Sequence, residues 1–295
     1  MISAHKLMCL TALLGPLSAA LHAAPTQWAE ANGVHLRYEL SGQGKDTVVL
    51  LHEVSTSLES WDFVVPELER THRLLRYDLR GFGLSERTHG TLTMEDEMED
   101  LRSLLAVLGI HDKVTMVGGA IGGAIALNFA AAHPELVSGV VAISPAAYMK
   151  RGGLSGNATG AAGNTGGAPG AAGASPATLS LEAAYPLELQ QAHPDRIARF
   201  RAIQAASDQA SFAASVPAAY NVAFAEVLPH IQCPALIIAT ARWIRPVSSF
   251  KELADAIPHG EFTVIDTGHF AAMESPELLI PVLEQFLDKH GSRGQ

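Results

Sequence analysis

The chain has 295 residues, of which 48% are hydrophobic, and it carries a formal net charge of −10. This length and apolar content suit a globular protein with one α/β domain and a sizeable core. The negative charge argues against a nucleic-acid partner, because such binding depends on basic side chains that contact phosphates.

The first 24 residues have the pattern of a secretory signal peptide. Lys6 precedes an apolar stretch over residues 7–21, and small residues at 18–20 and 23–24 offer cleavage sites. The apolar stretch is too short for a stable membrane span. We therefore expect a periplasmic or secreted protein with no stable membrane span after cleavage. The alternatives are an uncleaved anchor and a misassigned start.

Short apolar and β-branched runs predict the strands of a sheet. Residues 28–40 alternate around Asn32-Gly33, a pair that favours a β-hairpin. Residues 47–51 form a continuous apolar run, as expected for a strand buried on both faces. Further strands are predicted at residues 74–77, 114–117, 136–143, 235–239 and 262–265.

Helical spacing of apolar residues predicts helices over residues 94–108, about 120–132 and 277–289. The first has acidic residues in its first turn and ends at Gly109, a suitable C-cap. Strands alternating with helices imply an α/β fold with a mostly parallel central sheet and helices on both faces. The initial hairpin adds an antiparallel edge. Residues 25–150 and 231–290 form the two parts of this core.

The region between the two core parts has a different composition. Residues 151–178 contain mostly Gly and Ala with Ser, Asn and Pro, too few large apolar side chains to offset the entropy of ordering. We expect a disordered loop there. Residues 179–230 regain weak helical character and are expected to form a reduced lid of helices. The apolar residues expected to anchor it are Ile197, Phe200, Ile203 and Phe212.

A Gly-rich turn after the strand at Val114 dominates the sequence. Residues 118–123 read Gly-Gly-Ala-Ile-Gly-Gly and lead into an apolar helix. This is the layout of a nucleophile elbow, G-x-S-x-G, on a sharp strand-to-helix turn. The glycines stand at Gly118 and Gly122, but the serine position holds Ala120, whose methyl group cannot attack a carbonyl. A phosphate-binding loop is discounted because the Lys-Ser/Thr pair is absent.

Together these stretches resemble the α/β-hydrolase family over nearly all of the chain beyond the signal peptide. Residues 48–52 followed by Trp61 resemble the family's third strand and oxyanion loop. Residues 76–85 resemble its D-x-R-G-x-G-x-S turn, and residues 267–276 the loop of its catalytic histidine. The residues of these motifs are most similar to those of ester and lactone hydrolases of the 3-oxoadipate enol-lactonase type. The resemblance implies nucleophile, acid and histidine in that chain order.

Of the triad implied by this resemblance, only the histidine is retained, as His269. The acid position holds Arg242, or Trp243 if the alignment shifts by one residue. A guanidinium beside the imidazole would disfavour its cation, and we favour Arg242 pointing outward instead. Asp266 or Glu274 could hold His269. We weigh a working general base against a residual family feature without a task.

The oxyanion loop also departs from the family pattern, in which His-Gly follows the third strand. Here the pair is His52-Glu53. The backbone N–H groups of Val54 and Ile121 could still form the hole. A carboxylate at Glu53 would oppose negative charge there, so we weigh a general base or ligand-binding group against an outward-pointing loop residue.

Other candidates receive mainly structural or lining roles. His52, Trp61, Trp243 and Phe270 are expected to line a substrate pocket. Hydroxyls at Ser55, Ser57 and Ser144 could face the site but are more often turn or cap residues. Asp78 and Arg80 are expected to satisfy backbone groups and each other.

Changes at the nucleophile, acid and oxyanion positions indicate a sequence that has left serine hydrolysis. The first hypothesis is an exported protein that binds a small molecule in the old pocket, or a pseudoenzyme partner. The alternative is an enzyme that uses His269 as acid or base, with Glu53, in ester or lactone hydrolysis, lyase or decarboxylase chemistry. An ordinary serine esterase ranks lowest. No cofactor or metal ligand set is expected, and the oligomeric state is left open.

Overall fold

The computed structural model describes residues 26–88, 90–149 and 185–290. The predicted signal peptide, residues 1–24, and the predicted disordered loop, residues 151–178, lie outside the described residues. Both therefore stay predictions.

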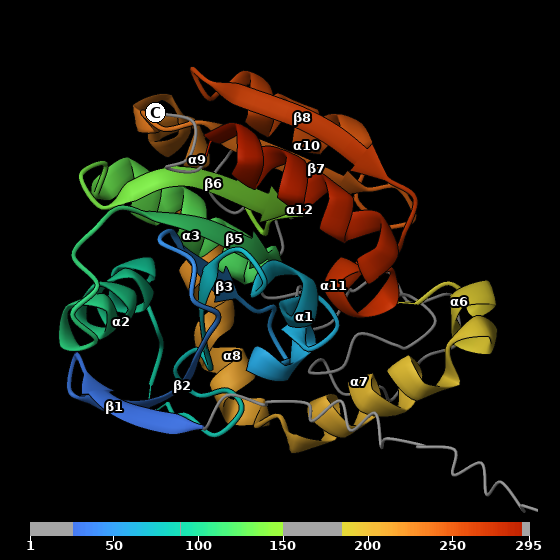
Figure 1. Cartoon of the computed structure of the whole chain (residues 1–295), viewed down its shortest axis with the longest axis horizontal. Coiled ribbons are helices and arrows are strands. Elements are labelled where there is room, and N and C mark those ends of the chain that lie inside the picture. Colours follow the sequence, from blue (N-terminus) through green and yellow to red (C-terminus); the bar gives the residue numbers. More distant parts are fainter. Residues whose placement is uncertain (1–25, 89, 150–184, 291–295) are drawn as a thin grey trace, which may run out of the picture.

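A sheet of eight strands runs through the structure in the order β1-β2-β4-β3-β5-β6-β7-β8 (Figure 1). Strands β1 and β2 pair antiparallel, as do β2 and β4, and the pairs from β4 through β3 to β8 are parallel. The predicted mixed sheet with an antiparallel N-terminal hairpin is confirmed. The strands are β1 (Gln27–Ala31), β2 (Val34–Ser41), β3 (Thr47–Leu51), β4 (Arg73–Tyr77), β5 (Val114–Gly119), β6 (Val137–Ile143), β7 (Ala235–Thr240) and β8 (Gly260–Ile265).

Helices cover both faces of the sheet, and the predicted long ones lie close to their expected bounds. The core helices are α1 (Val65–Leu68), α2 (Met94–Val107), α3 (Ala120–Ala132), α9 (Phe224–Val227), α10 (Val247–Asp255), α11 (Ala271–Glu274) and α12 (Pro276–His290), with 3-10 turns η1 (Leu58–Trp61) and η2 (Leu228–His230). Helix α2 begins with a capping box, in which Thr93 and Asp96 each bond the other's backbone N–H. Such a cap supplies partners for donors that the first helical turn leaves unpaired.

The alternation of side chains along the strands divides the core into two clusters. Val49 and Leu51 of β3 pack with residues of α2, α3 and α10 on one face. Val48 and Leu50 face the other way and pack with residues of η1, α1 and α12. Every strand residue of β3 is therefore buried, which explains its continuous apolar sequence. Helix α3 is buried from Ala120 to Ala130, so it is apolar on all sides.

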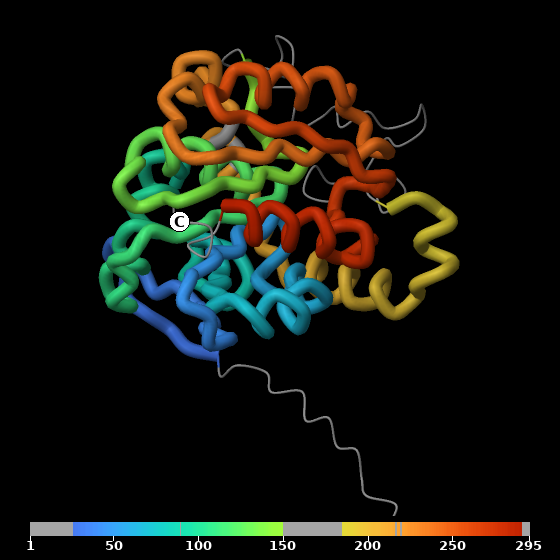
Figure 2. The backbone as a smooth tube through the Cα atoms, turned by 45° about the horizontal axis from the view of Figure 1, so that its top comes forward, coloured from blue at the N-terminus to red at the C-terminus, as the bar shows by residue number. Residues whose placement is uncertain are grey.

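A cap of three helices follows residue 184: α6 (Leu187–Ala192), α7 (Pro194–Ala206) and α8 (Gln209–Tyr220). In both views α6 and α7 project beyond the end of the sheet near α11 (Figures 1 and 2). Three predicted anchors, Ile197, Phe200 and Ile203, pack there with Phe270 and Met273. Arg196 of α7 donates to the carbonyl of Glu274 at 2.7 Å, which ties the cap to the C-terminal part of the core.

Candidate functional site

The strand-to-helix turn at residue 120 is built as an elbow. Ala120 has φ of +44°, a left-handed conformation that normally favours glycine. A Cβ on Gly118 would lie 2.3 Å from the backbone of Gly122, and one on Gly122 would lie 2.4 Å from the carbonyl oxygen of Leu51. Neither position can therefore carry a side chain, because the backbone segments approach too closely. The elbow keeps its strained geometry, which costs on the order of 1–3 kcal/mol, yet it carries only a methyl group.

The neighbouring hydroxyls contact other groups. Ser144, which also has positive φ, has its Oγ 2.7 Å from the hydroxyl of Thr240 and accepts from the Thr240 backbone N–H. Ser57 donates to the carboxylate of Glu59. Ser55 is buried with φ of +59°. Neither Ser144 nor Ser57 is held by an imidazole, as a serine nucleophile would be.

His269 lies near the end of the loop between β8 and α11, and its ring is buried among aromatic side chains. Trp243 stacks on it with ring centroids 3.9 Å apart, and Phe270 packs edge-on at 5.0 Å. Its Nδ1 has no hydrogen-bond partner within the described part of the chain. Burial lowers the pKa of His269 to about 3. The imidazole is therefore neutral at pH 7 and is a poor general acid.

The two carboxylates expected to hold His269 bind elsewhere. Asp266 accepts two hydrogen bonds of 2.8 Å from Arg242, whose guanidinium also lies 3.5 Å from Glu188 of α6. Arg242 is thus a surface residue, as favoured, and Trp243 is the residue that meets the imidazole. Glu274 instead holds the backbone of the histidine loop: it accepts from the N–H groups of residues 268 and 270, at 2.7 and 2.9 Å.

Glu53 does not point outward. It is 2% exposed, and its Oε1 lies 2.3 Å from the position of a Cβ on Gly119. The carboxyl group therefore lies against the elbow, next to residue 120, in space that only glycine leaves open. The hydroxyl of Thr56 reaches its Oε2 at 3.5 Å, a long hydrogen bond. Burial raises the pKa of Glu53 to about 7.

Two residues expected in the pocket wall, His52 and Trp61, are fully buried. The backbone N–H of Leu79 donates to His52 Nε2 at 2.9 Å, so the proton is on Nδ1, which donates to the Glu53 carbonyl at 2.7 Å. Burial lowers the pKa of His52 to about 4. Trp61 is fully buried in the core between the sheet and α12. The place of both side chains in the wall of a substrate pocket stays a prediction.

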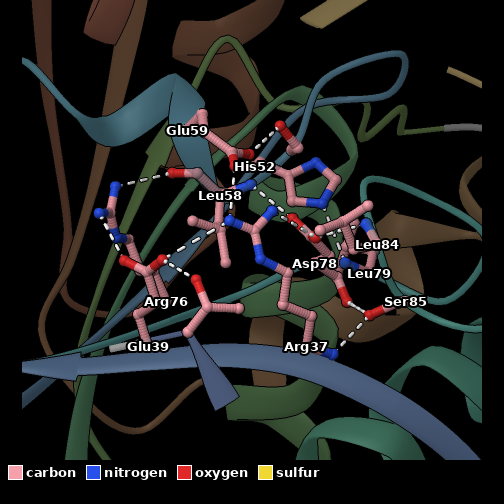
Figure 3. A network of polar contacts seen from close by, with 12 residues as sticks. Arg37, Glu39, His52, Leu58, Glu59, Arg76, Asp78, Leu79, Leu84 and Ser85 are labelled. Atoms are coloured by element: carbon pink, nitrogen blue, oxygen red, sulfur yellow. Dashed lines mark hydrogen bonds and ion pairs between the residues drawn. The ribbon is translucent and has the colours of Figure 1, made fainter. Parts of the chain in front are cut away.

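A network of buried polar groups fixes the loops beneath the site (Figure 3). Asp78 accepts from the N–H groups of Leu58 and Leu84 at 2.7 and 2.8 Å, and from Arg37 Nη1 at 3.2 Å. Arg37 also pairs with Glu59 at 2.6 Å. Asp78 therefore satisfies backbone groups as expected. Arg80 does not pair with it, because Arg80 is held by Asp100 of α2.

Tyr185 is a site residue that the sequence reasoning missed. Its ring packs on Phe200 at 4.9 Å and lies parallel to Phe270 at 6.4 Å. Its hydroxyl is buried and has no hydrogen-bond partner in the ranges that the structure covers. Burial raises its pKa, and the nearby carboxyls of Glu274 and Glu53 raise it further. One tyrosine after a Gly/Ala-rich segment carries no sequence signal of such a position.

The family model described as alpha/beta hydrolase fold matches residues 46–276. The chain belongs to the α/β-hydrolase fold family. Its elbow, histidine loop and oxyanion loop are therefore the corresponding parts of that fold. The predicted oxyanion donors, the N–H groups of Val54 and Ile121, follow Glu53 and the elbow residue in this framework and remain a prediction.

The chain spans about two fifths of the length of the curated relatives it matches. A 2-hydroxy-6-oxo-6-(2'-aminophenyl)hexa-2,4-dienoic acid hydrolase of Metapseudomonas resinovorans is 31% identical over 41% of this chain and 42% of its own. A 2-hydroxy-6-oxo-2,4-heptadienoate hydrolase of Pseudomonas putida is 35% identical over 38% of this chain and 41% of its own.

Solved structures match over more of the chain. The enol-lactonase of Burkholderia xenovorans LB400 has a TM-score of 0.76 at 25% identity, covering 88% of this chain and 99% of its own. An esterase of Thermogutta terrifontis has a TM-score of 0.73 at 25% identity, covering 90% and 100%. These likenesses confirm the resemblance to lactone and ester hydrolases drawn from the motifs.

Neither a metal cluster nor a membrane helix is found in the described ranges. No group of three His, Cys, Asp or Glu side chains there could hold a metal ion. Across the same residues, no helix is both long enough and apolar enough to cross a bilayer.

Proposed function

We propose that this protein binds a small molecule at the elbow and does not form an acyl-enzyme. The observation that carries the proposal is the methyl group of Ala120 at the strained turn. A serine hydrolase needs a nucleophile there, a base beside it and an acid behind the base. Here His269 is stacked on Trp243, and Asp266 and Glu274 bind other groups.

The remaining parts of the site support binding rather than acyl transfer. Glu53 places a carboxyl group against the elbow, where it would oppose an oxyanion that develops during attack on an ester. His269, Trp243, Phe270 and Tyr185 supply aromatic surface and buried polar atoms, the usual lining of a small-molecule site.

The proposal is tested by a fluorophosphonate probe, a nitrophenyl ester and a thermal-shift screen. We expect no covalent labelling, no burst of nitrophenolate, and a higher melting temperature with a compound of the screen that binds. Covalent labelling of any serine in the purified protein, mapped by mass spectrometry, would overturn the proposal and support an ordinary esterase.

A second candidate function is acid–base catalysis without a covalent intermediate. The observation that favours it is the Glu53 carboxyl, which is buried against the elbow. Burial raises the pKa of Glu53 to about 7, near the value that suits a general acid or base. His269, with its pKa lowered to about 3, is better placed as a neutral hydrogen-bonding group. In this case Glu53→Gln would abolish turnover of a substrate that leaves no label on the protein.

Export is a separate proposal. It rests on the sequence of residues 1–24 alone, with the charged start, apolar stretch and small residues of a signal peptide. A fusion of these residues to a reporter that is active only outside the cytoplasm tests it, because an inactive fusion would contradict export.

A further inference from the structure

We infer that the ligand of this site carries a protonated amine on an apolar body, and that the carboxyl group of Glu53 binds the amine. This inference deepens the proposed function, since it names the chemical class of the ligand for the same site. It rests on three features: the acidic groups at the elbow, buried polar atoms without partners, and the placement of the basic side chains.

Two carboxyl groups approach the site from opposite parts of the chain. Glu53 lies against the elbow from the loop after β3, and Glu274 lies under the histidine loop, bonded to the N–H of Phe270. Burial raises the pKa of Glu274, and the charge of Glu53 raises it further. A cation bound to Glu53 would offset this repulsion and favour the ionised forms.

Two buried polar atoms without partners belong to residues that pack against Phe270. The Tyr185 hydroxyl is 1% exposed and the imidazole of His269 is 7% exposed. Neither the hydroxyl nor His269 Nδ1 has a hydrogen-bond partner among the residues that the structure describes. The rings of both residues pack against Phe270, and the charges of Glu274 and Glu53 help to raise the pKa of the Tyr185 hydroxyl. A buried polar atom left unpaired is unfavourable, so an occupant that can donate hydrogen bonds is expected.

An occupant that donates hydrogen bonds suits the acceptors at this place. The Glu53 carboxylate accepts, and one ring nitrogen of neutral His269 accepts. The Tyr185 oxygen can also accept. An ammonium group offers three N–H donors and a positive charge, which match these acceptors. Trp243, Phe270 and Phe200 contribute aromatic rings, which attract a cation and bury its apolar body.

The basic side chains near the site are committed elsewhere, which disfavours an anionic ligand. Arg242 forms its bidentate pair with Asp266 at the surface. Arg196 binds the Glu274 carbonyl and the carboxylate of Glu277. A carboxylate ligand would therefore meet the Glu53 carboxyl without a neutralising guanidinium, and like charges in a buried site repel each other.

The test uses three probes that differ only in their polar end: 2-phenylethylamine, 2-phenylethanol and 3-phenylpropionate. Calorimetric titration at pH 8 is made on the full chain and on Glu53→Gln, with Glu67→Gln as the control. Glu67 is an exposed acid on α1 that pairs with Arg70, so its loss changes net charge equally. We expect the amine to bind at least about tenfold tighter than the carboxylate, because charge-assisted hydrogen bonds are worth that much.

The variants separate a charge effect from general damage. Glu53→Gln is expected to weaken amine binding about tenfold or more and to leave the alcohol unchanged, whereas Glu67→Gln leaves both unchanged. Tyr185→Phe removes the unpartnered hydroxyl, so it should weaken amine binding a few-fold with no loss of melting temperature. It keeps the test valid if Glu53→Gln fails to fold.

Several outcomes would overturn the inference. They are carboxylate binding as tight as amine binding, full amine affinity in Glu53→Gln, and no amine binding at millimolar concentration. These results concern only the ligand class. Failure of the proposed function is recognised separately, by fluorophosphonate labelling of the unmodified protein, which does not depend on any amine.

Discussion

Replacing Ala120 by serine would return the missing oxygen to the elbow, but we expect this single change to leave the protein almost inactive as an esterase. The backbone already holds residue 120 at φ of +44°, so a serine side chain would occupy the nucleophile position. The obstacles lie in the groups around it. Trp243 meets the imidazole where the acid belongs, and Glu53 lies against the turn.

The size of the defect follows from the protonation of His269. A serine can attack only if the imidazole takes its proton, and burial lowers the pKa of His269 from 6.5 to about 3. This shift disfavours the imidazolium by about 5 kcal/mol, or on the order of 10³-fold in rate. Lack of an orienting acid has an effect of similar size in serine hydrolases, about 10⁴-fold.

A repair series tests this reasoning. Ala120→Ser is compared with Ala120→Ser/Trp243→Asp, which adds an acid beside His269, and with the triple variant that also carries Glu53→Gly. Nitrophenyl acetate hydrolysis and the rate of fluorophosphonate labelling are measured for each. We expect the triple variant to exceed Ala120→Ser by on the order of 10³-fold. Far-UV circular dichroism and melting temperature confirm that each variant is folded.

The result that would refute the reasoning is specific. If the labelling rate of Ala120→Ser alone is within about tenfold of the rate of the triple variant, then neither the stacked Trp243 nor the Glu53 carboxyl blocks the site. His269 would then act as a base despite its buried ring, and the oxygen at residue 120 would be the sole missing part.

Three further predictions concern stability and are measured by chemical denaturation. Gly83→Ala places a Cβ 2.1 Å from Asp78 Oδ2 at a φ of +51°, so we expect the free energy of unfolding to fall by about 2–4 kcal/mol; a loss below 1 kcal/mol would contradict this. Burial raises the pKa of Glu97 from 4.5 to about 8. The contribution of the Glu97 side chain to the free energy of unfolding is therefore full below pH 4.5 and is lost as the pH rises toward 8. Glu97→Leu should remove about 3 kcal/mol of the decline between pH 5 and pH 8, whereas exposed Glu99→Gln should not, and an unchanged slope in Glu97→Leu would be evidence against a buried acid. Ala120→Gly relieves positive φ and should raise the free energy of unfolding by about 0.5–1 kcal/mol; a decrease would mean that the methyl contact outweighs the strain.

The order and bounds of the core elements could be predicted because their signals are local. A continuous apolar run such as residues 47–51 can be buried only between two layers of helices. Asn32-Gly33 fixes the hairpin, with positive φ at both residues. Gly118 and Gly122 mark the elbow, since the neighbouring backbone leaves no room for a side chain at either position.

The sequence by itself therefore determined the fold, the sharp turn and the alanine at residue 120 of that turn, because each depends on residues close together in the chain. The tertiary structure alone decided which groups meet at the site. It brought Trp243 rather than Arg242 to His269, turned Glu53 onto the elbow and added Tyr185 from the cap. These contacts join residues more than 25 positions apart, and their side-chain directions depend on how the loops and the cap pack, which no local pattern records.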